Sequence, residues 1–135
     1  MPSGAGPIAV AISTSALSTT AETVIATITG NWNNPVGNLL TAALVATATG
    51  AATLTIRVRQ GGVAGAQVTG STSVYTFAGA AATVAVDGGQ FVDTSAFAVT
   101  PAQAGVYVLT AQASVASTIT PTGGMFELET MAPVQ

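Results

Sequence analysis

The stretch at residues 53–60, TLTIRVRQ, alternates between polar and apolar side chains from Thr53 to Arg59. Successive side chains of a β-strand point to opposite faces of its sheet, so a period of two residues is typical of a strand that is buried on one side. Leucine, isoleucine and valine would then face a core, while Arg57 and Arg59 would face away from it. The segment is therefore predicted to be a strand with two arginines on its outer face.

Comparable short runs recur along the whole chain, and many of them are rich in β-branched residues, which favour strands. Residues 39–49 have a spacing that a short helix would also satisfy, but their valine and threonines favour a strand. A turn is expected at Asp87-Gly88-Gly89, because glycine adopts positive φ without steric cost. Loops are expected at residues 30–38, 61–73 and 118–124, with a weak edge strand inside 61–73. The other predicted strands are residues 8–12, 22–29, 74–78, 83–86, 91–99, 106–115 and 125–131.

Many short strands with turn signals about every 8–12 residues indicate an all-β sandwich or barrel. Immunoglobulin-like and jelly-roll sandwiches both fit this pattern. The absence of cysteine and of a tryptophan inside a strand disfavours an antibody-type domain, and an apolar final strand favours a jelly roll. We expect a single jelly-roll-like antiparallel β-sandwich at residues 8–131, with a flexible arm at 1–7 and a short tail at 132–135.

Charged residues make up 5% of the chain, whereas an ordinary domain has about 25%. A free monomer normally keeps its surface soluble with charge. Such a charge-poor surface is expected where identical subunits or a larger assembly cover much of it. The complete set of charged residues is Glu22, Arg57, Arg59, Asp87, Asp93, Glu127 and Glu129.

The same inventory argues against several classes of partner. Affinity for nucleic acid comes from Lys and Arg, and this chain has two arginines and a net charge of −3. The best membrane-span candidate, residues 39–58, contains a glycine, several threonines and Arg57, so strands fit it better. The N-terminus has no basic region, and a secretory signal is not expected.

The chain offers little for catalysis, because it contains no His, Cys or Lys that could act as a base beside a nucleophile. Glu127 and Glu129 lie about 7 Å apart along a strand, which two-carboxylate chemistry would allow, but an exposed polar face explains them better. Asp87 and Asp93 are interpreted as turn and local hydrogen-bond residues rather than calcium ligands, since calcium takes about 6–8 oxygens. We therefore expect no enzyme activity, no metal and no cofactor.

Two groups of residues are candidates for subunit or partner contacts. Trp32 is the only tryptophan and lies in the loop at residues 30–38, where it either caps the core or anchors a contact. Arg57 and Arg59 have the same spacing as Glu127 and Glu129. The two pairs could form a ladder across neighbouring strands or across a subunit interface, because the planar guanidinium suits carboxylates. The alternative is that all four are independent solvated charges.

The order Phe91-Val92-Asp93-Thr94, Thr100-Pro101 and Gly105-Val106-Tyr107 resembles the late strands of small trimeric jelly rolls in bacteriophage capsid decoration (cement) proteins and tail-fibre heads. It is also similar to the Gly-x-Tyr strand of folds like tumour necrosis factor and complement C1q. The resemblance covers residues 74–115 and implies a homotrimer that binds the major capsid protein or ends a fibre. Asp93 and Tyr107 are expected to specify the fold rather than to form a site.

The expected function is thus a non-enzymatic structural protein of the virion, a decoration protein that stabilises a phage head by trimeric binding to the capsid lattice. The alternative is a tail-fibre or spike tip that binds a receptor, for which the loop containing Trp32 and the region of Tyr75 would supply the contacts. A carboxylate-dependent hydrolase is a third and remote possibility.

Overall fold

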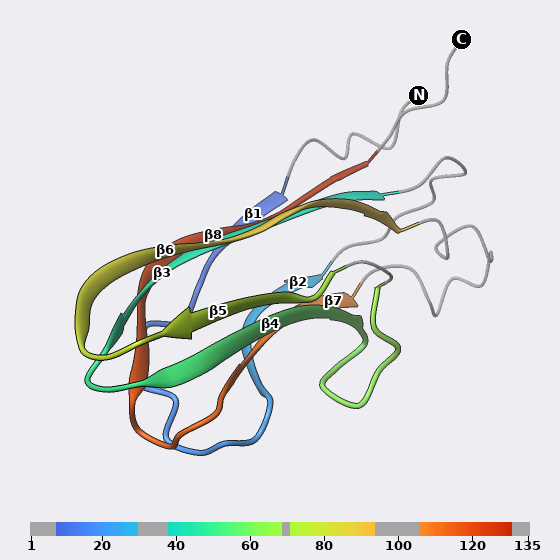
Figure 1. Cartoon of the computed structure of the whole chain (residues 1–135). Coiled ribbons are helices and arrows are strands. Elements are labelled where there is room, and N and C mark those ends of the chain that lie inside the picture. The colour runs from blue at the N-terminus through green and yellow to red at the C-terminus, as the bar shows by residue number, and fades with distance from the viewer. Residues whose placement is uncertain (1–7, 30–37, 69–70, 94–105, 131–135) are drawn as a thin grey trace, which may run out of the picture.

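The computed structural model describes residues 8–29, 38–68, 71–93 and 106–130, and it describes only the backbone of residues 8, 38–39, 81–93 and 128–130. The described residues form two antiparallel sheets that face each other as the layers of a sandwich (Figure 1). Their strands are β1 (Ile8–Ala11), β2 (Thr23–Thr29), β3 (Asn38–Ala48), β4 (Ala52–Gln60), β5 (Ser73–Phe77), β6 (Ala81–Asp93), β7 (Val106–Ala113) and β8 (Ile119–Thr130).

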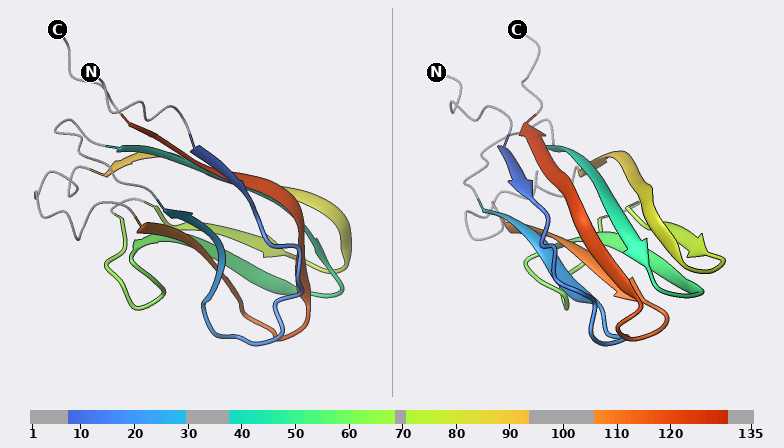
Figure 2. Two further views of the ribbon diagram at one scale, coloured as in Figure 1. Left: turned by 180° about the vertical axis from the view of Figure 1, so that it is seen from behind. Right: turned by 90° about the vertical axis from the view of Figure 1, so that its left-hand side faces the viewer.

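The strand order identifies the fold. One sheet has the order β1-β8-β3-β6 and the other has the order β2-β7-β4-β5, so every connection except β4 to β5 passes from one sheet to the other (Figure 2). Eight strands in two four-stranded sheets with these crossings are the jelly-roll arrangement, which reduces the number of exposed sheet edges. The predicted all-β jelly-roll sandwich is confirmed.

The core lies between the two sheets and is built by alternation along the strands. In β4 the burial alternates as expected, with Leu54, Ile56 and Val58 buried and the residues between them partly exposed. Tyr107 on β7 is 2% exposed, in agreement with its predicted packed position. The largest fully buried side chains are Tyr107, Phe126, Ile28, Leu40, Leu44, Leu54, Ile56, Leu109, Ile119 and Val58.

The turn predicted at Asp87-Gly88-Gly89 is wrong, because β6 runs through it without interruption. The register with β3 pairs Ala42 with Gly89 and Ala43 with Asp87, so Gly88 is the extra residue of a β-bulge. Glycine in a strand often marks such a bulge. The long partner strand β3 provides pairing on both sides of the glycines, and this continuous pairing replaces the turn.

The loop predicted at residues 118–124 is also wrong, because β8 begins at Ile119 and continues to Thr130. The register shifts between Val45 and Ala46, which face Gly123 and Pro121, so Thr122 is bulged. Pro121 adjoins this bulge, one of the few places where a sheet tolerates proline. Pairing with β3 again keeps a Gly- and Pro-rich segment extended.

Residues 39–49 form a strand as predicted, because β3 covers Asn38–Ala48. A short turn then leads to β4. The apolar stretch at 39–58 therefore belongs to two strands, and no helix in the described part of the chain is long and apolar enough to cross a membrane. A weak edge strand is predicted within residues 61–73. In the described part of this segment, the structure has an isolated β-bridge from Gln67 to Arg59 instead. The predicted arm at 1–7, the tail at 132–135 and the loop with Trp32 lie outside the described residues.

Candidate functional site

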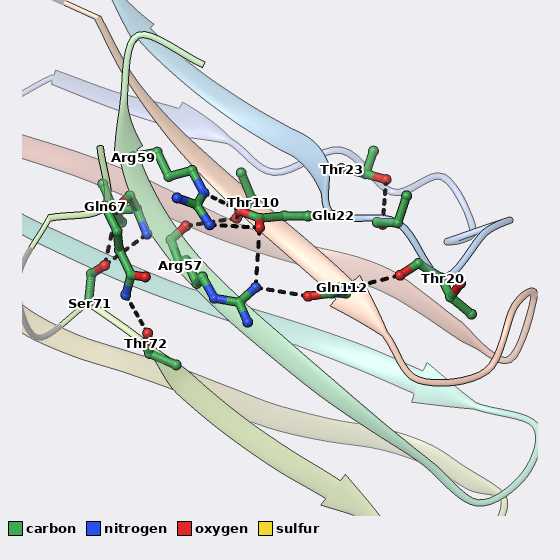
Figure 3. A network of polar contacts seen from close by, with 12 residues as sticks. Thr20, Glu22, Thr23, Arg57, Arg59, Gln67, Ser71, Thr72, Thr110 and Gln112 are labelled. Carbon is green, nitrogen blue, oxygen red and sulfur yellow. Dashed lines mark hydrogen bonds and ion pairs between the residues drawn. The ribbon is translucent and has the colours of Figure 1, made fainter. Parts of the chain in front are cut away.

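A polar cluster on the outer face of the β2-β7-β4-β5 sheet contains three of the seven charged side chains (Figure 3). Arg57 and Arg59 extend from β4, Thr110 lies on the central strand β7, and Glu22 directly precedes β2. Gln112 on β7 completes the group. We refer to Glu22, Arg57, Arg59, Thr110 and Gln112 as the Glu22 cluster.

The carboxylate of Glu22 accepts hydrogen bonds from both arginines. Arg59 donates from Nε to Oε2 at 2.6 Å and from Nη2 to Oε1 at 2.9 Å, while Arg57 donates from Nη1 to Oε1 at 3.3 Å. The two bonds from Arg59 form the bidentate geometry in which charge-assisted hydrogen bonds are strongest. The side chains of Glu22, Arg57 and Arg59 are 14%, 22% and 20% exposed, so this is a largely desolvated ion group.

Strand order explains how Glu22 reaches two arginines that lie two strands away. Strand β7 separates β2 from β4, and its outer face presents Thr110 directly opposite Arg57. The small threonine leaves room for the Glu22 side chain to cross over β7. The Thr110 hydroxyl donates to Glu22 Oε2 at 2.5 Å, and the residue is 0% exposed even though it faces away from the core.

Further hydrogen bonds connect the Glu22 cluster to the surrounding loops. Arg57 Nη1 also donates to Gln112 Oε1 at 2.9 Å, and Gln112 Nε2 donates to the carbonyl of Thr20 at 3.2 Å. Arg59 Nη1 donates to the carbonyl of Gly65 at 3.0 Å in the loop between β4 and β5. The cluster thereby ties the segment before β2 and the loop after β4 to the sheet.

The electrostatics of the site favour its charged form. The hydrogen bond from Arg59 lowers the pKa of Glu22 below its ordinary value of 4.5; burial works in the opposite direction, and Thr110 and the positive charges of Arg59 and Arg57 lower the pKa further. The hydrogen bond to Glu22 correspondingly raises the pKa of Arg59. Glu22 is therefore ionised and Arg59 is protonated at neutral pH.

These shifts predict an acid dependence of stability. Because the pKa of Glu22 is lower in the folded state than in the unfolded chain, its contribution is complete above about pH 4.5 and is lost as the pH falls through the folded pKa. Urea unfolding between pH 7 and pH 2 should show this loss for the wild type and a shallower one for Glu22→Gln. Equal acid profiles for the wild type and Glu22→Gln would contradict the prediction.

An open hollow of about 350 Å³ adjoins the Glu22 cluster on the same sheet face. It shares Gln112 with the cluster and is otherwise rich in hydroxyl groups. Such a lining offers donors and acceptors but no titratable group. Its residues are Thr20, Thr53, Thr55, Gln112, Ala113 and Ser114.

The arginine ladder predicted from spacing is wrong for neighbouring strands of one chain. Arg57 and Arg59 lie on β4 in one sheet, whereas Glu127 lies on β8 in the other sheet. Glu127 is exposed and follows the fully buried Phe126, so it faces away from the core on the opposite side of the sandwich. The side chain of Glu129 lies outside the described residues. A ladder between subunits is not tested by this arrangement.

Sequence reasoning missed Glu22 as the partner of the arginines. Its position at the start of the strand expected at residues 22–29 carried no information about which strand would be its neighbour. The signal that would have found it is the jelly-roll strand order, because that order places β7 between β2 and β4. Among the described residues, no group of three or more His, Cys, Asp or Glu side chains could hold a metal ion.

Comparison with known proteins finds solved structures with a similar fold but no similar sequence. No protein-family model matches the chain, and no curated protein sequence matches it significantly. A structure of infectious bursal disease virus, Gx strain, has a TM-score of 0.56 at 11% identity, over 95% of this chain and 34% of that chain. The Gt strain of the same virus has a TM-score of 0.54 at 12% identity, over 92% and 32%.

A CBM4 structure has a TM-score of 0.48 at 13% identity, over 95% of this chain and 86% of that chain, which is too low to support an argument. This chain spans about one third of the length of the viral chains that it resembles. At 11% and 12% identity the similarity concerns the fold. The chain is therefore a jelly roll of a kind that also occurs in infectious bursal disease virus.

Proposed function

We propose that this chain is a non-enzymatic structural protein of a virus particle, in which it packs against copies of itself and against other shell subunits. The observation that carries the proposal is a jelly-roll sandwich formed by a chain with very few charged residues. Only 5% of the residues are charged, and three of those residues form ion pairs with one another within the Glu22 cluster. Surfaces of this kind suit contact with other proteins better than they suit water.

Exposed apolar side chains support the same interpretation. Val63, Val74, Val115 and Met125 are between 42% and 59% exposed, and they come from both sheets and from the loops between strands. Single exposed apolar residues are ordinary, but here few charged side chains surround them. Contacts on several sides of one domain are expected in a shell, where each subunit has several neighbours.

The specific form that we propose is a decoration protein that binds the head of a bacteriophage as a homotrimer and contacts the major capsid protein. The similarity of the virus structures to this fold supports a virion location, and the short motif around Tyr107 supports the decoration role. Trp32, Arg57, Arg59, Glu127 and Glu129 are the proposed contact residues.

Native mass spectrometry of the purified protein tests the trimer directly. One chain has a mass of 13.1 kDa. At micromolar concentration, we expect the main species in the spectrum to have three times this mass. Peptide mapping of purified virus particles should then detect the chain in stoichiometric amount with the main shell protein. A stable monomer that is absent from particles would refute the proposed function.

A further inference from the structure

The charges of this chain are segregated between the two sheets of the sandwich. Arg57 and Arg59 with Glu22 leave the β2-β7-β4-β5 side with one net positive charge. Strands β6 and β8 of the other sheet contain all the remaining charged residues, which are four carboxylates. Together these account for the net charge of −3. In so charge-poor a molecule, this division dominates the electrostatic field.

Each face presents an accessible group of the appropriate sign. On the acidic face, Glu127 is exposed next to the apolar Met125, which points to the same side of β8. On the other face, the hydrogen bonds of Arg57 to described side chains use Nη1. Its second terminal nitrogen extends away from the cluster with no bond drawn to it (Figure 3).

The hollow beside the Glu22 cluster is suited to a carboxylate. Its hydroxyls from Thr53, Thr55 and Ser114 can donate hydrogen bonds. Gln112, which lines the hollow, also accepts a hydrogen bond from Arg57, so the guanidinium contacts a residue of the lining. A partner that inserts an acidic side chain here would find both donors and positive charge. The acidic face of a second copy carries such a group at Glu127.

Geometry then determines the kind of symmetry. Because the two complementary faces lie on opposite sides of the sandwich, they can meet only in a heterologous, head-to-tail contact. An isologous contact through either face would place like charges opposite each other, which is unfavourable. Repeated from copy to copy, a heterologous contact gives a ring where the rotation between copies closes and an open filament where it does not.

We propose that copies of this chain associate head to tail, with Glu127 of one copy in the hollow beside Arg57 of the next. The inference rests on the proposed function, for which it supplies the contact between subunits. The contact is partly exposed to solvent, so it should weaken with ionic strength, because the Debye length falls from about 10 Å at 0.1 M salt to about 3 Å at 1 M.

Two variants that each disable one face test the proposal. Glu127→Lys reverses the charge of Glu127 on the acidic face, and Arg57→Met removes the Arg57 guanidinium from the other. By analytical ultracentrifugation, each variant alone should associate at least about tenfold more weakly than the wild type. An equimolar mixture should recover a heterodimer, because every mixed pair retains one intact acidic face and one intact arginine face. Ala78→Lys adds a positive charge in the exposed turn after β5 and should associate like the wild type.

Circular dichroism and thermal melting verify that each variant is folded. If Arg57→Met does not fold, Thr55→Glu blocks the hollow without removing a member of the Glu22 cluster, and it replaces Arg57→Met in the mixture. The proposal is overturned if Glu127→Lys associates as tightly as Ala78→Lys, if the mixture yields no heterodimer, or if the wild type stays monomeric at millimolar concentration.

Failure of this contact and failure of the proposed function have different signatures. If the chain is found in purified virus particles while Glu127→Lys leaves self-association unchanged, the proposed function stands and the head-to-tail contact is wrong. If the variants behave as expected but the chain is absent from particles, the contact stands and the proposed function is wrong.

Discussion

Replacing Gly124 by alanine is expected to lower the free energy of unfolding by about 3–5 kcal/mol. Gly124 has φ of 138°, a conformation that residues with a side chain rarely adopt. A Cβ placed there would clash with the carbonyl oxygen of Ala43 and lie 2.6 Å from the Cα of Leu44, both main-chain atoms of β3. Since backbone atoms in the middle of a sheet cannot rotate away, β8 or β3 would have to shift.

The neighbouring glycine provides the control. A Cβ at Gly123 would meet nothing within 4 Å, and its φ is not in the left-handed region. Gly123→Ala should therefore change the free energy of unfolding by less than about 1 kcal/mol. Urea unfolding of both variants and the wild type, followed by circular dichroism, makes the comparison. Equal stability of the two variants would show that β8 does not approach β3 as closely as described.

Replacing Glu22 by glutamine is expected to lower the free energy of unfolding by about 2 kcal/mol at pH 7. The change retains the shape of the side chain but removes the charge that compensates Arg57 and Arg59. The amide would also present donors where both arginines and the buried Thr110 hydroxyl need an acceptor. The cost is smaller than for a fully buried ion pair because the three charged side chains remain partly exposed.

A double-mutant cycle separates this ion group from a general effect of charge. Glu22→Gln, Arg59→Met and the double variant should give a coupling energy of about 1–2 kcal/mol, since the bidentate contact is the main link between them. Below the concentration at which copies associate, Glu127→Gln removes an exposed carboxylate from the other sheet and should change the free energy of unfolding by no more than about 0.5 kcal/mol. A coupling energy near zero would mean that the bidentate pair does not stabilise the fold.

Prediction of the fold from sequence succeeded where one face of a strand is apolar over several residues. The alternation of Leu54, Ile56 and Val58 requires a strand, because only a period of two buries all three together. It failed at Asp87-Gly88-Gly89 and at residues 118–124, where glycine and proline suggested turns. At both places, hydrogen bonding to a neighbouring strand outweighed the local preference of glycine and proline for turns, because β3 pairs with β6 and β8 along their whole length.

For the candidate site too, the sequence predicted some features correctly and others wrongly. The outward orientation of Arg57 and Arg59 followed from alternation alone, but equal spacing suggested Glu127 and Glu129 as partners when the arginines bind Glu22. Spacing along a chain is shared by many pairs and carries no information about which strands become neighbours. Glu22 lies 35 residues before Arg57 in the sequence, and only the position of β7 between β2 and β4 brings the two together.

The sequence by itself determined that this protein consists of short strands around one apolar core and that it has very few charges, because periodicity and composition are local properties. Only the tertiary structure decided which strands are neighbours, that Gly124 must approach β3 without a Cβ, and that the two arginines and Glu127 lie on opposite faces of the sandwich. Those features depend on strand order and register, which arise from long-range pairing between segments that are far apart in the chain.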